Sequence, residues 1–190
     1  RPFVGRIQLD GVAVDYEDER FPIGAKREPE ALRTTLQRVD GVVDLHPDRS
    51  VSWNAWVRGS TDLVQQARVT GNYTVKDSRL FLDIHQCRAS LAPLLARYAP
   101  QSISFASLEV AGDLTLLYTP KESANSLIYQ ADAAIERAAF TTRELQGSIH
   151  SLHGRIQATP DAVRGALTGV WRGQPVSVRG VVRRPDRPIL

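Results

Sequence analysis

The stretch Leu108-Glu109-Val110-Ala111-Gly112-Asp113-Leu114-Thr115-Leu116 decides the fold class of this 190-residue chain. Leucine and valine alternate in it with acidic and hydroxyl side chains, which is the period of a strand with one buried and one wet face. A glycine sits at the centre of the alternation. This pattern is typical of an antiparallel sheet that packs one face against apolar material and leaves the other in water.

The same unit, in which a glycine lies between an apolar residue and an alternating run, recurs along the chain. Its six copies centre on Gly11, Gly41, Gly71, Gly112, Gly154 and Gly180. A glycine inside a strand usually marks a bulge, a bend or the close approach of another backbone. Repeating that device curves a sheet in one sense, which produces a trough, a barrel or the edge of a sandwich. The simpler interpretation is that glycine is common near turns.

One segment departs from the strand pattern and predicts a short helix. Four apolar side chains there fall at helical spacing: Leu91, Leu94, Leu95 and Tyr98. With Ser90 as the N-cap, the helix is expected over residues 90–99, and Pro100 ends it. Residues 20–35 predict a long connection, with room for one helical turn around residues 31–36.

The composition is that of a folded protein, with 42% hydrophobic and 24% charged residues. No stretch approaches the roughly 18 consecutive apolar residues of a membrane helix. The net charge of +3 is small, and arginines alternate with acidic residues along most of the chain, so no nucleic-acid partner is expected. The single cysteine, Cys87, predicts a small buried apolar side chain. The chain begins at Arg1 and lacks methionine, and we expect residues 1–190 to be one segment of a longer protein.

The sequence contains no motif of a catalytic or metal site. Four histidines are present: His46, His85, His150 and His153. The closest two are three residues apart, which places them on opposite faces of a regular strand, so no metal site is expected. The acidic residues 15–19 lack the spacing of a calcium loop. We find no phosphate-binding glycine loop and no nucleophile elbow, and we expect neither an enzyme nor a cofactor.

Several segments carry a family resemblance. Residues 80–84 form a strand-like run, residues 90–100 contain a leucine-proline-leucine segment, and residues 108–116 form a glycine-containing strand. In this order they resemble the repeats of TamB and the wider AsmA-like proteins. Residues 39–56 and 167–180 are similar to such repeats.

The resemblance implies a curved antiparallel sheet folded into an open β-taco, or groove, that crosses the periplasm. Its apolar inner face would carry phospholipid acyl chains between the inner and outer membranes and so support the integrity and assembly of the outer membrane. It also implies a parent protein anchored in the inner membrane of the cell envelope. An outer-membrane barrel of the TamA or BamA type would contact regions outside this segment. The residues expected to line the groove are Val51, Trp53, Val110, Leu114, Leu116, Leu127, Tyr129, Ile135, Ile156, Val176 and Val178.

Two other functions fit the same alternation. In the first, the apolar residues form the dry core of a two-sheet sandwich, a periplasmic or extracellular module that binds a glycan or a protein. Trp53, Trp56 and Trp171 would then be sugar platforms, with Trp56 the best placed on the wet face beside Asn54 and Arg58. In the second, the chain is a structural spacer. The identity of the lipid, the direction of transport and its energy source are left open.

Overall fold

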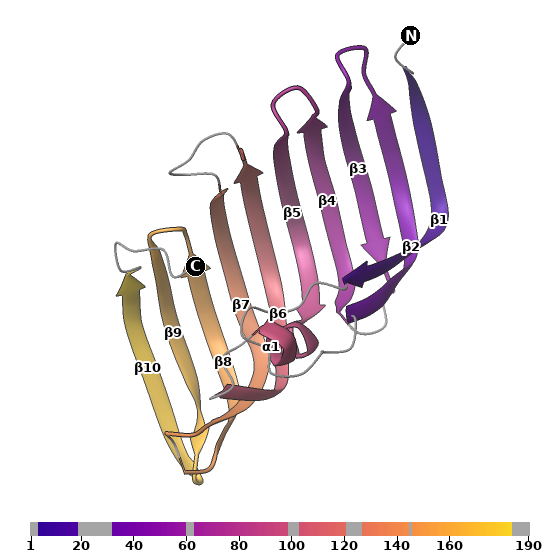
Figure 1. The fold of residues 1–190 in the computed structure, drawn as a ribbon. Helices are drawn as coiled ribbons and strands as arrows, with labels where there is room; N and C mark the ends of the chain where they lie inside the picture. Colours follow the sequence, from indigo (N-terminus) through magenta and orange to yellow (C-terminus); the bar gives the residue numbers. More distant parts are fainter. Residues whose placement is uncertain are drawn as a thin grey trace.

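The structure, a computed structural model, describes residues 4–18, 32–59, 63–98, 103–120, 127–144 and 146–183. These residues form ten strands and one short helix (Figure 1). The strands are β1 (Gly5–Asp18), β2 (Leu32–Leu45), β3 (Ser50–Arg58), β4 (Val64–Thr74), β5 (Arg79–Ser90), β6 (Ile103–Tyr118), β7 (Leu127–Thr142), β8 (Ser148–Ala158), β9 (Ala162–Trp171) and β10 (Gln174–Arg183). The helix, α1 (Ala92–Tyr98), lies between β5 and β6 in the chain.

All ten strands belong to one sheet and follow one another in chain order, each antiparallel to its neighbours. The sheet is curved and does not close, so β1 and β10 are its two edges (Figure 1). Its shortest turn is Arg172–Gly173, where φ is 51° and 75°, as a two-residue type I′ hairpin requires. The described residues therefore confirm the predicted all-β class, and they form one sheet where the sandwich alternative requires two.

The register joins one apolar residue from every strand into a continuous row. Each member is the direct cross-strand partner of the next, and side chains opposite one another in a sheet share a face. The row is Leu9, Gly41, Ala55, Val69, Ile84, Leu114, Ala131, Ala158, Val163 and Val182. We call the side of the sheet that carries it the apolar face. The chain thus directs the apolar side of its alternating strands to one surface of a single layer.

The strands bend where the pairing is irregular. Six of the nine strand pairs contain a register shift, a bulge that adds a residue on one strand and tilts it. Gly112 shows why the unit needs glycine: an added Cβ would lie 2.6 Å from the Cα of Ala133 and closer still to the carbonyl oxygen of Asp132. Gly154 is equally crowded and has φ of +146°, which disfavours any other residue. The interpretation as points of close backbone approach is confirmed for four of the six repeat glycines, and at the other two an added Cβ would meet no atom within 4 Å; the four are Gly41, Gly71, Gly112 and Gly154.

The apolar face is on the inner side of the bend. On β6, Phe105 lies on one side of the bulges and Val110 on the other, yet both pack against the same buried cluster. That cluster consists of Leu108, Ile135, Ala138 and Leu152. Leu95 of α1 packs on it too, and the lower ends of β6 and β7 curve beneath the helix (Figure 1). A second cluster, Val39, Val57 and Ala67, occupies the β2–β4 part of the same face.

Two details of the helix prediction need correction. The helix begins at Ala92, so Leu91 stands at the N-cap position, and Ser90, the expected cap, is the last residue of β5. The Leu91 amide donates to the carbonyl oxygen of Leu108 over 2.8 Å, which ties the helix start to β6. The expected helix end at residues 99–100 lies outside the described residues. In the part of the chain that is described, no helix has the length and apolarity to cross a membrane.

The connection predicted over residues 20–35 ends earlier than expected, because β2 begins at Leu32. Residues 32–35 are the beginning of β2, and the helical turn expected around residues 31–36 is wrong where it is described. There β2 pairs with β1, as in Asp15 opposite Thr35, and Thr35 donates to the Asp15 carboxylate over 2.6 Å. Cross-strand pairing outweighs the weak local helix preference of this segment. Residues 19–31, the rest of the connection, lie outside the described residues.

Candidate functional site

The apolar face is the candidate site, and it holds all eleven residues that the sequence predicts to line a groove. Leu116 is opposite Tyr129, Ile156 is opposite Ala133, and Val178 is opposite Leu167. The register connects each of the others to the same face. Residues from β3 to β10 are therefore gathered on one surface.

Five strands contribute to the apolar face although the sequence predicted no lining residue in them. These strands are β1, β2, β4, β5 and β9, which supply Leu9, Gly41, Val69, Ile84 and Val163 to the ten-strand row. A usable signal was present in β5, where Leu80, Leu82 and Ile84 alternate with Phe81 and Asp83. Counting alternation strand by strand would have found them.

The side chains of the apolar face are only partly covered. Of the eleven predicted residues, Ile135 is buried, with 7% of its surface exposed, whereas Leu127 and Val178 are exposed at 44% and 62%. The remaining eight are half-buried. A side chain in the core between two sheets would lose nearly all contact with water. The burial seen here is what lateral neighbours within one layer provide.

The described cover on this face is α1. Leu91, Ala92 and Leu95 pack against the cluster around Leu108, and the helix contacts β6. Toward the C-terminal edge the apolar face becomes more exposed, as at Val182, which is 72% exposed. Large exposed apolar patches on soluble proteins usually mark a surface that binds something apolar.

Small side chains, with the exception of Ile156, follow the bend beside the ten-strand row. The neighbouring row from β5 to β10 consists of Cys87, Gly112, Ala133, Ile156, Gly165 and Gly180. Larger residues, such as Leu116 and Tyr129, lie on the other side of the ten-strand row. The apolar face therefore has shorter side chains on one side of the ten-strand row than on the other.

The opposite face carries most of the charged side chains, and several of them form ion pairs on β1–β7. Arg6 binds the Asp44 carboxylate over 2.7 Å, and Arg137 pairs with Glu109 across β6 and β7. The hydrogen bond and charge of Arg6 hold the pKa of Asp44 below its ordinary value. These exposed pairs contribute little stability each, but they keep this face hydrated. The two sides of the sheet thus differ in polarity, and the polar face includes one row of apolar residues, Phe81, Leu117 and Ile128.

The histidines of the polar face make local contacts. His85 bonds Asp83 over 2.8 Å and lies 3.4 Å from Asp113, and these carboxylates raise the pKa of its imidazole, Asp83 most. His150 and His153 were predicted on opposite faces, and this is wrong. A bulge at Ser151, where φ is 54°, inserts one residue and turns both to the polar face.

The ring of His153 is hydrogen-bonded to Thr168 and to the carbonyl oxygen of Ser151, both at 2.9 Å. Among the described residues, no group of three or more histidine, cysteine or carboxylate side chains is placed to hold a metal ion. Cys87 is half-buried, less than the full burial that the sequence predicts, and this partial burial raises the pKa of its thiol.

The three tryptophans do not form a shared platform. Trp53 lies on the apolar face, against Gly71 of β4. Trp56 points to the polar face, where the Arg58 guanidinium lies 5.5 Å from its ring centre. Trp171 is on β9, and its indole N–H donates to the carbonyl oxygen of residue 146 over 3.3 Å. Their separation offers no support for a sugar site built from all three.

No protein-family model, characterised protein or solved structure matches this chain. The resemblance to TamB and AsmA-like proteins therefore stays a prediction. The structure itself shows the open, curved sheet and its apolar face.

Proposed function

We propose that the chain is a segment of a lipid-conducting protein whose apolar face holds the acyl chains of phospholipids while their headgroups stay in water. The observation that carries this proposal is the unbroken apolar row across all ten strands, with side chains that remain half-exposed. A row that crosses the whole sheet offers an acyl chain a route from one edge to the other. No chemical step is part of the proposed role.

The energetics favour this use of the face. Each methylene group that leaves water gains about 0.8 kcal/mol, so a 16-carbon chain in water is unfavourable by about 12 kcal/mol. An apolar surface that extends from β1 to β10 lowers this cost at every point along its length. The charged pairs on the opposite face suit its contact with water.

By its architecture the segment suits a route between two membranes, and we extend the proposal to the periplasm. The parent protein would be anchored in the inner membrane, and a barrel of the TamA or BamA type would be met by other parts of it. Support for this extension comes from the open sheet, which has the shape that the family resemblance implies.

The test compares two neighbouring leucines of β6. Leu116 faces the apolar side, opposite Tyr129, whereas Leu117 faces the polar side, opposite Ile128. Leu116→Arg places a charge in the path of the acyl chain, and Leu117→Arg is the matched control. Native mass spectrometry should find phospholipid bound to the wild type and to the control, and little on Leu116→Arg.

Phospholipid transfer between vesicles should follow the same order, and urea unfolding should show that both variants are folded. Absence of bound lipid from all three proteins would contradict the proposal. Binding on a glycan array in the absence of lipid would instead support the binding-module alternative.

A further inference from the structure

The last three strands carry an unusual excess of arginine. Residues 148–183 contain five arginines and one acidic residue, Asp161. Four of the arginines lie on the polar face, because their chain neighbours, such as Ile156 and Val163, lie on the apolar face. These four, which we call the arginine surface, are Arg155, Arg164, Arg179 and Arg183. Arg155 and Arg179 are the outer partners of Ala166, so they lie in one row.

The arginine surface lacks the matching anions seen elsewhere on this face. In β1–β7, Arg6 and Arg137 each pair with a carboxylate on a neighbouring strand, and Arg88 of β5 pairs with Glu136 of β7, two strands away. Within the described ranges, none of the four side chains of the arginine surface forms an ion pair or a hydrogen bond. Four unmatched guanidinium groups on adjacent strands repel one another, and a bound anion would relieve that repulsion.

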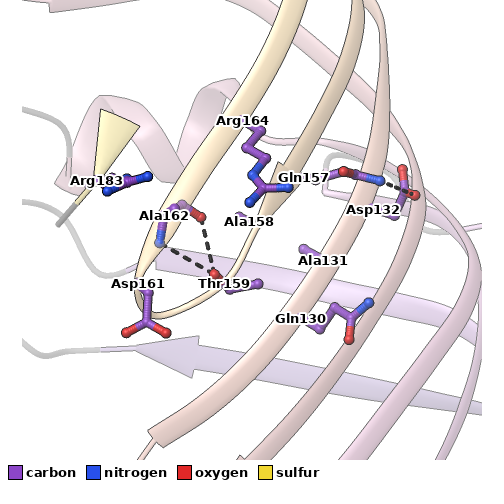
Figure 2. A pocket seen from close by; sticks show the side chains of 10 residues that line it. All are labelled: Gln130, Ala131, Asp132, Gln157, Ala158, Thr159, Asp161, Ala162, Arg164 and Arg183. Carbon is purple, nitrogen blue, oxygen red and sulfur yellow. Dashed lines mark hydrogen bonds between the residues drawn. The ribbon is translucent and has the colours of Figure 1, made fainter. Parts of the chain in front are cut away.

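Two adjoining hollows give this surface a shape. The first, of about 540 Å³, lies beside the turn between β8 and β9 and includes Arg164 and Arg183 (Figure 2). The second, of about 470 Å³, includes Arg155, Arg164 and Arg179. Arg164 and Gln157 line both, so the hollows are continuous. Together they have room for an anion and the organic group that bears it.

Two carboxylates also line the first hollow. Asp132 accepts a hydrogen bond from the Gln157 amide over 3.1 Å, and Asp161 lies in the turn (Figure 2). Against four guanidinium groups, these two leave the combined hollows positive. The amide of Gln157 and the hydroxyl of Thr159 add neutral hydrogen-bonding groups.

We propose that the arginine surface binds a phosphate group, either free or in a phospholipid headgroup. The guanidinium fork matches two phosphate oxygens with paired hydrogen bonds, and a phosphate supplies the negative charge that the surface lacks. Because this surface lies on the face opposite the apolar one, the inference does not depend on the proposed function.

Calorimetric titration in low salt tests it with two soluble probes, inorganic phosphate and glycerophosphoglycerol, the deacylated headgroup of phosphatidylglycerol. The variant Arg164→Gln/Arg179→Gln should bind at least tenfold more weakly than the wild type, because each lost charged hydrogen bond is worth about a factor of ten. Asp161→Asn should bind more tightly. Arg68→Gln, on the polar face of β4 and outside both hollows, is the matched control and should bind like the wild type.

Tighter binding of glycerophosphoglycerol identifies the headgroup as the source of the phosphate, and tighter binding of inorganic phosphate identifies the free ion. The proposal is overturned if neither probe binds the wild type, or if Arg68→Gln weakens binding as much as the double variant. Thermal unfolding of each variant distinguishes a lost site from a lost fold.

Discussion

Replacing Gly112 with alanine tests whether the bend of the sheet requires the repeated glycine. The new Cβ would lie 2.6 Å from the Cα of Ala133, where an ordinary contact begins at 3.4 Å. Both this atom and the nearer carbonyl oxygen of Asp132 belong to the backbone of β7, which no rotamer change can move aside. The strand would have to shift by about 1 Å, and forced shifts of this kind cost about 2–3 kcal/mol.

Gly165 provides the control, since it lies in the same row of small residues, two strands beyond Ala133. A Cβ there would find its nearest atoms, the carbonyl oxygen of Arg155 and a side-chain carbon of Ile156, at 3.7 Å. Gly165→Ala should therefore stabilise the fold by about 0.5 kcal/mol through a less flexible unfolded chain. Equilibrium unfolding in urea, followed by circular dichroism, measures both. Equal free energies of unfolding for the two variants would refute the account of the bend.

Three further outcomes are expected. Alkylation of Cys87 at neutral pH should be slow in the folded protein and fast in urea, because burial, aided by the Asp113 carboxylate, raises the pKa of the thiol; equal rates would contradict this. The pKa of His85, followed by NMR, should lie above that of a free histidine and fall in Asp83→Asn. Because a group with a raised pKa stabilises the fold below its unfolded pKa, this contribution should be lost as the pH rises through the folded pKa. An unchanged His85 titration in the variant would refute the pairing. Leu95→Ala should destabilise by about 1–2 kcal/mol in urea unfolding, since this half-buried side chain joins α1 to the Leu108 cluster; no change would mean that the helix packs loosely.

Alternation predicted which side of each analysed strand is apolar, because a strand exposes successive residues on opposite faces. Val51 and Trp53 of β3 and Val176 and Val178 of β10 lie on the expected side. The same rule could not predict that all ten strands share one layer. Strand order depends on pairing between residues far apart in the chain, and a sandwich satisfies the same pattern.

Bulges account for the errors within strands. At Ser151 and Gln86, φ is 54° and 52°, and neither residue type signals a left-handed backbone. The first of these bulges brings His150 and His153 to the same face, whereas their spacing of three residues predicts opposite faces in a regular strand. Bulges at glycine, as at Gly11 with φ of 60°, were visible in the sequence. In this chain, only the bulges that contain a glycine could be predicted from the sequence.

The central claim is that hydrocarbon occupies the apolar face. Tyr129 and Ile128 are adjacent in β7 and point to opposite faces, as their partners Leu116 and Leu117 do. Photo-crosslinking with benzoylphenylalanine at each position, in bacterial cells, reports directly which face meets lipid. We predict a phospholipid adduct from position 129 and none from position 128; equal yields from the two positions, or no lipid adduct from position 129, would contradict the claim.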